Sequence, residues 1–221
     1  MTVGTTALQR QFTVHVVDDD ESVRSALSRL FRSTGHLVRT FGSARDYLDE
    51  VSPEESGCVV LDIRMPGMDG LTLQERMSER GFDAPIVFVS GHADVPISVR
   101  AMKHGAVDFL EKPFKDEDLL DAVDRAIALD AELRERRSSN ARFRCALEDL
   151  TSREYEVMTH VIAGKLNKII ARTLHVSEKT VKVHRGRVMK KLEASSLAEL
   201  VRLTERAGVL AAKPNDSTGV V

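Results

Sequence analysis

The feature that most constrains the fold is a regular series of short apolar runs in the first 130 residues. Several of these runs are continuously apolar, which is typical of strands that are covered on both faces. Segments with the period of a helix lie between them. Five strands alternating with five helices predict a doubly wound, five-stranded parallel α/β sheet. The strong runs are 12–17, 58–61, 86–89 and 107–110, and the run 37–41 is weaker.

Four of the intervening segments carry an apolar stripe at helical spacing, which is typical of amphipathic helices. In chain order, the stripes are Val23, Ala26, Leu27 and Leu30; then Leu71, Leu73 and Met77; then Val95, Val99 and Met102; and last Leu119, Leu120, Val123, Ala126 and Ile127.

The charge of the chain changes sign between its two halves. Residues 1–130 hold 14 basic and 23 acidic side chains, net −9, whereas residues 131–221 hold 18 and 11, net +7. The overall charge of −2 is the sum of these two values and conceals the contrast between the halves. A hydrophobic content of 42% excludes wholesale disorder, and 221 residues suggest one or two domains. An acidic front and a basic rear predict two functions, with nucleic acid a candidate partner of the rear half.

The chain has the features expected of a cytoplasmic protein without a membrane span. No stretch approaches 18 apolar residues, and residues 1–11 lack the pattern of a signal peptide. Cys58 and Cys145 lie 87 residues apart, outside any metal-ligand spacing, and we expect them to be reduced and mostly buried.

Polar residues follow four of the expected strands at the edge where parallel strands place their carboxyl ends. Asp18, Asp19 and Asp20 follow the first strand, and Asp62, Ser90 and Lys112 follow later ones. A single aspartate after a strand more often caps a helix. Several carboxylates that converge would repel one another unless a cation such as Mg²⁺ intervened. Joint placement therefore favours a site where a metal-held carboxylate attacks phosphorus while a lysine neutralises charge.

Three segments of the front half resemble a response-regulator receiver domain. They are 16–20 (VVDDD), 61–70 (LDIRMPGMDG) and 111–114 (EKPF), and the resemblance covers roughly residues 10–130. It implies a flavodoxin-like fold in which Asp62 accepts phosphate from a sensor histidine kinase. It also implies a Mg²⁺ site made of Asp19, Asp62 and the backbone carbonyl of Arg64, with Asp18 acting through water.

The same resemblance assigns roles to the residues after the fourth and fifth strands. Ser90 and Lys112 would each bond a phosphoryl oxygen, and the Lys112–Pro113 peptide bond would be cis. Phe109 matches an aromatic switch position, although an ordinary core phenylalanine is an equally good interpretation of it.

The boundary between the halves is a charged helical stretch over 115–137. Ser138, Ser139 and Asn140 interrupt it and provide the best linker signal. The helix would serve either as a lever or dimerisation element, or as a connector that only tethers the two domains.

From Leu150 onward the pattern is helical. Thr151 and Glu154 form a capping box, and Gly164 ends the helix that follows. A short helix, a turn at His175–Val176 and a longer helix opened by Ser177 have the order of a helix-turn-helix. Val181, Val188 and Leu192 would face the core. Nine basic side chains lie in 165–191 against Glu178 alone: Lys165, Lys168, Arg172, Lys179, Lys182, Arg185, Arg187, Lys190 and Lys191.

Residues 148–207 resemble the effector domain of the NarL/FixJ (LuxR-type) family, through 150–154 (LTSRE), Asn167-Lys168 and 177–185 (SEKTVKVHR). In the front half, 91–96 (GHADVP) and 105–110 (GAVDFL) are FixJ-like in particular. The resemblance implies base contacts and phosphate contacts from the longer helix. The base contacts would come from Lys182 and Val183, with Arg185 a further candidate; the phosphate contacts from Lys179, Thr180 and His184; and Arg187 and Lys190 complete the expected DNA-binding set.

Three residues depart from the family pattern. His175 stands where glycine is common, so the turn would need a positive φ from a side-chain-bearing residue. Ile169 replaces a commonly polar residue. Gly186 lies within the longer helix, where alanine would be better by about 1 kcal/mol.

Together these patterns predict a two-component transcriptional regulator. The expected organisation is a flexible N-terminus (1–11), a receiver domain (12–130), a helical linker (131–147), an all-α helix-turn-helix domain (148–210) and a flexible tail (211–221). Phosphorylation of Asp62 would favour a homodimer that binds double-stranded promoter DNA, and RNA polymerase is a further candidate partner. The sequence does not identify the kinase, its signal, the promoter or the sign of regulation.

Two alternatives remain at this stage. One keeps the DNA-binding domain and makes the receiver a protein-docking module that ignores phosphate, although a docking surface needs neither the acidic set nor Ser90 and Lys112. The other is a haloacid-type phosphatase with an aspartyl nucleophile. That chemistry usually has an acid two residues after the nucleophile, where this chain has Arg64. We therefore expect a regulator and not an enzyme, apart from the receiver's part in its own phosphorylation and dephosphorylation.

Overall fold

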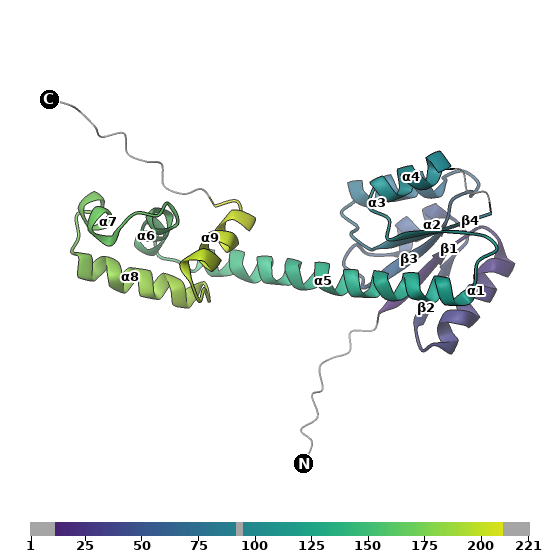
Figure 1. Ribbon diagram of the computed structural model, residues 1–221, viewed down its shortest axis with the longest axis horizontal. Coiled ribbons are helices and arrows are strands. Elements are labelled where there is room, and N and C mark those ends of the chain that lie inside the picture. Colours follow the sequence, from purple (N-terminus) through teal and green to yellow (C-terminus); the bar gives the residue numbers. More distant parts are fainter. Residues whose placement is uncertain (1–11, 92–94, 210–221) are drawn as a thin grey trace, which may run out of the picture. The chain divides into compact units, whose positions relative to one another are not determined.

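The computed structural model describes residues 12–91 and 95–209, which form two compact units that meet between Arg134 and Glu135 (Figure 1). The expected flexible segments 1–11 and 211–221 lie outside the described residues, as do residues 92–94 of the GHADVP segment. No described helix has the length and apolar character needed to cross a membrane. Each unit is treated separately below.

The first unit contains a five-stranded parallel sheet in the order β2-β1-β3-β4-β5. Val17 is paired with both Phe41 and Leu61, so the carboxyl ends of the three strands β1–β3 are level. The chain leaves β1 toward β2 on one side and continues to β3 on the other, so the strand order switches at β1, which is where open α/β sheets usually place their sites. The strands are β1 (Thr13–Val17), β2 (Leu37–Phe41), β3 (Gly57–Asp62), β4 (Ile86–Ser90) and β5 (Asp108–Glu111).

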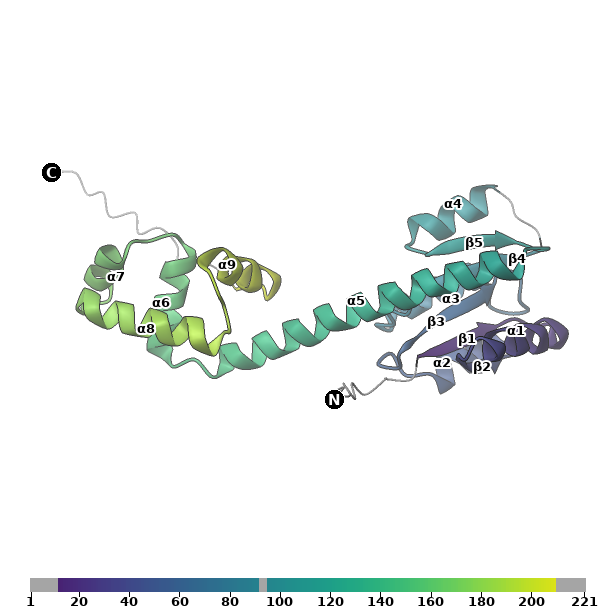
Figure 2. The ribbon, with the colours of Figure 1, turned by 60° about the horizontal axis from the view of Figure 1, so that its bottom comes forward.

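Helices cover both faces of the sheet, as Figure 2 shows, and this confirms the predicted doubly wound fold. Helices α2, α3 and α4 pack on one face around Tyr47 and Met77, while α1 and the first part of α5 pack on the other around Phe31 and Val123. The helices of this unit are α1 (Glu21–Ser33), α2 (Ala44–Glu50), α3 (Gly70–Glu79), α4 (Val95–Lys103) and the start of α5 (Asp116–Glu148).

The apolar stripe noted in the sequence of α4 is exposed and does not form the buried face of the helix. Val95 is 74% exposed, and Val99 and Met102 are each 45% exposed. Ala101 is buried instead, and Ile97 packs partly against the same core. Spacing identifies residues that share a face of a helix, but it does not determine which face meets the sheet. Here a small alanine makes the close contact.

The predicted interruption at Ser138–Asn140 was also wrong, because α5 continues unbroken from Asp116 to Glu148. Serine and asparagine lower helix stability only by fractions of a kcal/mol each, which continuous backbone hydrogen bonding can offset.

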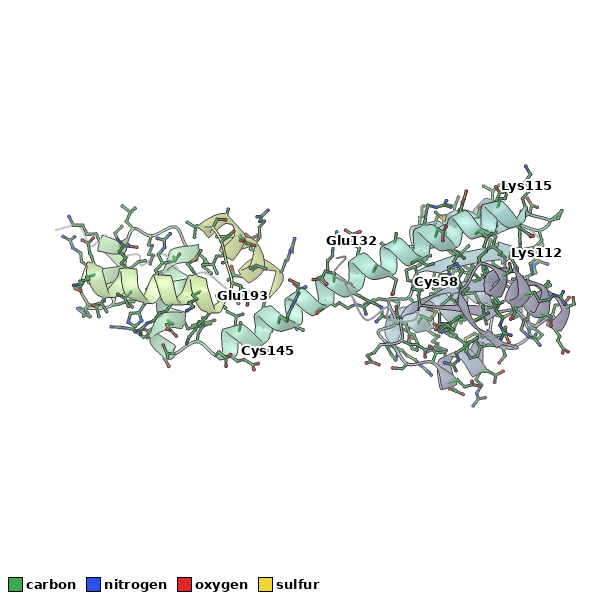
Figure 3. All side chains as sticks on the ribbon, turned by 90° about the horizontal axis from the view of Figure 1, so that it is seen from below. Cys58, Lys112, Lys115, Glu132, Cys145 and Glu193 are labelled. Atoms are coloured by element: carbon green, nitrogen blue, oxygen red, sulfur yellow. The ribbon has the colours of Figure 1, made fainter. Side chains whose placement is uncertain are left out.

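The two cysteines were predicted to be mostly buried. Cys58 is buried in β3, but Cys145 is exposed on the C-terminal part of α5, as the side chains in Figure 3 show.

The second unit is helical and has its own core around Val157, Ile170 and Val181. Gly164 ends the first helix of this unit after α5, as predicted from the sequence, and its φ is +74°. The end of α5 also contributes to this core, because Phe143 is buried in it. The remaining helices are α6 (Ser152–Ile162), α7 (Asn167–Thr173), α8 (Glu178–Lys191) and α9 (Leu197–Arg206).

The predicted capping box at the start of α6 is present, and its glutamate does more than cap the helix. Glu154 Oε2 accepts hydrogen bonds from the Thr151 backbone N–H at 3.0 Å and from Lys191 Nζ at 2.7 Å. Lys191 Nζ also donates to the Asp149 carbonyl at 2.9 Å. These bonds join the start of α6 to the end of α8, and chiefly the Lys191 bond lowers the pKa of Glu154 to about 2.

We predict that Glu154→Gln destabilises the second unit at neutral pH. Because the folded-state pKa lies below the ordinary value of 4.5, the ionic contribution is complete above pH 4.5 and disappears as pH falls toward 2. Amide hydrogen exchange in α6 and α8 should therefore be faster in the variant than in wild type at pH 7. This difference in exchange rate should become smaller as the pH falls below 4.5. A difference that does not depend on pH would contradict the ionic interpretation.

Candidate functional site

One ammonium group lies between two carboxylates at the carboxyl edge of the sheet. Lys112 Nζ is 2.8 Å from Asp18 Oδ2 and 2.9 Å from Asp62 Oδ1. Asp18 follows β1, Asp62 ends β3 and Lys112 follows β5, where Figure 3 labels it. The Lys112 backbone N–H donates to the Ser90 carbonyl at 2.7 Å, which holds the loop after β5 beside the end of β4. Parallel pairing therefore brings together residues from four separate strand ends.

The acidic groups of this site are buried. Asp18 is 2% exposed, Asp62 is 7% exposed, and Ser90 at the end of β4 is buried as well. Burial raises the pKa of Asp62, and the negative charge of Asp18 adds to this effect while the Lys112 ammonium opposes it. Burial alone would lower the pKa of Lys112, but its bonds to Asp18 and Asp62 prevail and raise it. The lysine therefore stays protonated as the counter-ion of the pair.

Backbone N–H groups fix the direction of both buried carboxylates. Asp62 Oδ2 accepts from the Arg64 N–H at 2.7 Å, and Asp18 Oδ1 accepts from the Asp20 N–H at 2.9 Å. The Asp20 side chain has the ordinary capping role, because its Oδ1 accepts from the Ser22 N–H at the start of α1. The common interpretation of an aspartate after a strand thus applies to Asp20, while Asp18 and Asp62 face Lys112.

The donor set of this edge fits Mg²⁺ in chemical type, because it consists of carboxylate and backbone carbonyl oxygens. In the part of the chain that the structure describes, no three histidine, cysteine or acidic side chains are gathered into a metal-binding cluster. Asp19 is exposed, and the cation between Asp18 and Asp62 is the Lys112 ammonium. The two buried carboxylates therefore already converge on a positive charge.

Gly70, which the sequence analysis did not single out, is required by the backbone beside Asp62. A Cβ atom on Gly70 would lie 2.4 Å from the Asp62 carbonyl oxygen, and the Gly70 N–H donates to the Ile63 carbonyl at 2.9 Å. This close approach folds the loop after β3 back onto the strand end. A glycine at the start of a helix was the available signal, but it has several other causes.

Phe109 on β5 is half-buried, and its ring centroid lies 6.3 Å from that of Phe88 on β4. It packs against the buried cluster on the α4 face of the sheet. This position suits an aromatic switch and an ordinary core residue equally well. The Lys112–Pro113 peptide bond is cis, as predicted.

The second candidate site is the surface of α8. Its inward face is as predicted, because Val181, Val188 and Leu192 are buried. Most of the residues predicted to contact DNA are exposed. The exposed side chains are those of Lys179, Lys182, Val183, Arg187 and Lys190, and the half-buried ones are those of Thr180, His184 and Arg185.

Three contacts modify the predicted DNA-binding surface. Arg185 Nη1 donates to Asn167 Oδ1 at 3.4 Å, a contact between α8 and α7. The Ser177 and Thr180 hydroxyls lie 2.8 Å apart at the start of α8, where Ser177 caps the helix. Lys191 points to Glu154, so this member of the basic run contributes to the fold.

The turn before α8 is held by a side chain from α6. His175 has φ of 53°, as predicted for this departure from glycine. Arg153 Nη2 donates to the Leu174 carbonyl at 2.5 Å, next to that strained residue. Ile169 is 49% exposed, so the apolar departure on α7 lies on the surface. Leu166 begins α7 without a side-chain cap.

Comparisons with known proteins match both units. The response regulator receiver domain family matches residues 14–124, and the luxR family of bacterial regulatory proteins matches residues 148–204. The transcriptional regulatory protein FixJ of Bradyrhizobium diazoefficiens is 43% identical over 197 residues, which cover 89% of this chain and 96% of FixJ. The chain belongs to the NarL/FixJ family of response regulators.

Other similar proteins cover nearly the whole chain. Nodulation protein W of the same organism is 46% identical over 94% of this chain and 92% of its own length. The solved structure of the response regulator StyR is 47% identical, covers 89% of this chain and 99% of that one, and superposes with a TM-score of 0.76. As a response regulator, the chain is a two-component regulator of transcription with a LuxR-type DNA-binding domain, and not a classical enzyme.

We predict that Gly70→Ala destabilises the receiver by about 1–3 kcal/mol, because its new Cβ would overlap the Asp62 carbonyl. Gly186→Ala in α8 is the matched control, since the added Cβ would meet no atom within 4 Å beyond the adjacent backbone of its own helix, and it should stabilise that helix by about 1 kcal/mol. Urea unfolding, followed separately for each unit, measures both changes. Equal stability of Gly70→Ala and wild type would contradict the close approach.

Proposed function

We propose that a sensor histidine kinase transfers phosphate to Asp62 and that the phosphorylated chain dimerises and binds promoter DNA. The observation that carries this proposal is the buried Asp18–Lys112–Asp62 bridge at the carboxyl edge of the sheet. A buried nucleophile with a lysine at hydrogen-bonding distance meets the needs of phosphoryl transfer, because negative charge accumulates on the transferred oxygens.

In the transfer step, a carboxylate oxygen of Asp62 forms a bond to phosphorus as the phosphorus–nitrogen bond of the kinase phosphohistidine breaks. The leaving imidazole keeps the electron pair of that bond. The Lys112 ammonium, which bonds Asp62 before the reaction, moves its hydrogen bond to a phosphoryl oxygen, and the Ser90 hydroxyl donates to another. The Arg64 N–H keeps the Asp62 carboxylate oriented.

Asp19, Asp62 and the Arg64 backbone carbonyl would hold Mg²⁺, with Asp18 acting through water. The bound metal supplies positive charge to the phosphoryl oxygens. Lys112 balances Asp18 and Asp62 before the metal binds, and this keeps the two buried carboxylates together. The shift of Lys112 toward the phosphate and the repacking of Ser90 and Phe109 would signal the change to the β4–α4–β5 surface.

For DNA recognition, α8 enters the major groove. Lys182 and Val183 read base edges, with Arg185 a further candidate. The exposure of Lys182 and Val183 supports this assignment. Lys or Arg can bond the edge of guanine, and a valine methyl can meet the methyl of thymine. The phosphate contacts are assigned to Lys179, Thr180 and His184, supported by Arg187 and Lys190.

We retain the predicted domain limits as part of this proposal: receiver 12–130, helical linker 131–147 and DNA-binding domain 148–210. The division into two compact units and the two family matches support them. Dimerisation would place two DNA-binding domains on two half-sites. RNA polymerase is the further partner proposed for the DNA-bound dimer.

We predict that Asp62→Asn removes the response to phosphate. With Mg²⁺ and fluoroberyllate, wild type should dimerise in gel filtration and bind its promoter more tightly. The variant should keep the oligomeric state and the DNA affinity that it has without the mimic. The asparagine lacks the carboxylate that bonds beryllium or phosphorus. Equal DNA affinity of both proteins, with and without the mimic, would favour a docking receiver that ignores phosphate.

We predict that Lys182→Ala weakens binding to the selected DNA site by about 1–3 kcal/mol, roughly 5- to 150-fold, and relaxes base preference at one position. Arg206→Ala, a change of an exposed basic residue on α9, is the control and should leave affinity within twofold. Wild-type binding should also fall steeply with salt, because the basic surface displaces counterions from DNA phosphates. Titration of labelled DNA at several salt concentrations measures both; a flat salt response would contradict the assignment.

A further inference from the structure

Arg24 in the first turns of α1 holds the backbone that carries two of the proposed metal ligands. Its Nη1 donates to the Asp18 carbonyl at 2.7 Å and to the Asp19 carbonyl at 2.9 Å. The Arg24 side chain is half-buried. One guanidinium nitrogen thus binds two successive peptide groups of the loop between β1 and α1.

The guanidinium of Arg24 also lies close to the end of β2. A Cβ atom built on Gly42, directly after β2, would lie 3.8 Å from both Cζ and Nη1 of Arg24. The Asp18 N–H also donates to the Phe41 carbonyl at 3.2 Å. Arg24 therefore lies beside the loop after β2, while both of its hydrogen bonds go to the loop after β1.

The two carbonyl bonds restrict the directions of the acidic side chains. A peptide plane whose carbonyl is bonded cannot rotate freely, and the side chain on either side of it is restricted with it. The bonded carbonyls belong to the peptide groups on either side of Asp19, so the backbone of Asp19 is held at both ends. The bond to the Asp18 carbonyl likewise helps to keep the Asp18 carboxylate directed toward Lys112. Without Arg24, the loop would lose two charge-assisted hydrogen bonds, which are stronger than neutral ones.

We propose that Arg24 is a positioning residue that preorganises Asp18 and Asp19 for Mg²⁺ and so raises the affinity of the receiver for the metal. The inference rests on the proposed function, because it takes the metal ligands from there. Arg24 acts through the loop and does not itself touch the metal or the phosphate.

Preorganisation and simple electrostatics predict opposite effects of removing Arg24. A positive charge near a metal site repels Mg²⁺, so loss of the charge alone would tighten metal binding. Loss of the carbonyl bonds frees the loop and weakens binding. The sign of the change therefore distinguishes a positioning residue from a cation that is merely nearby.

The test is calorimetric titration of MgCl₂ into the unphosphorylated full-length chain. Arg24→Gln should raise the Kd for Mg²⁺ about tenfold or more, the effect expected when a residue that orients metal ligands is lost. Arg24→Lys keeps the charge but cannot reproduce the guanidinium geometry, so its Kd should lie between those of wild type and Arg24→Gln. Arg32→Gln, a change of an exposed arginine at the other end of α1, should leave the Kd within twofold.

A second measurement reports on the loop without metal. The Asp20 N–H donates to Asp18 Oδ1, so its hydrogen exchange in Mg²⁺-free protein should accelerate in Arg24→Gln but not in Arg32→Gln. If Arg24→Gln does not fold, Arg24→Lys carries both measurements, with a weaker Kd and faster exchange expected. Unchanged or tighter Mg²⁺ binding in the folded Arg24 variants would overturn the inference. Absence of Mg²⁺ binding by wild type would instead overturn the proposed function.

Discussion

The ammonium of Lys112 between the carboxylates of Asp18 and Asp62 is the interaction on which the site depends. Without the ammonium, the two buried negative charges at the ends of adjacent strands would repel each other, and one of the carboxylates would become protonated. The ion bridge replaces lost hydration for all three groups, and backbone N–H groups of Asp20 and Arg64 satisfy the remaining carboxylate oxygens. Removal of Lys112 would leave both carboxylates buried without compensation, which costs far more than the net gain of the bridge. The bridge thus holds three charged side chains together at the carboxyl edge of the sheet.

The second unit uses the same physical device for a different purpose. Glu154 is buried at the start of α6, and Lys191 from the end of α8 neutralises it. In the receiver the buried acids lie at the carboxyl ends of strands, where Lys112 bridges them. In the DNA-binding unit it joins two helices whose exposed surfaces remain available. Arg153 adds to this by bonding the Leu174 carbonyl beside the strained His175, so that the turn and α8 keep a fixed relation to α6.

Arg24 and Gly70 show that the loops around the site depend on residues that take no direct part in its chemistry. Arg24 bonds carbonyls, and Gly70 only leaves space for one. Neither role was assigned from the sequence. An arginine near the start of a helix is common, and Gly70 entered only as one residue of the segment 61–70. Their roles depend on the distance between backbone atoms of different segments, which no spacing along the chain encodes.

The short apolar runs, alternating with segments of helical period, were enough to predict a parallel sheet for the front half, since strands covered on both faces are typically continuously apolar. Strand-end placement likewise indicated Asp18, Asp62 and Lys112, and helical spacing indicated the buried face of α8. Tertiary structure decided what local patterns leave open. It placed Ala101, and not Val95, Val99 and Met102, against the sheet; continued α5 through Ser138; exposed Cys145; and turned Lys191 from the basic surface to Glu154. The physical reason is that periodicity states which residues share a face, whereas burial and ion pairing depend on what packs against that face.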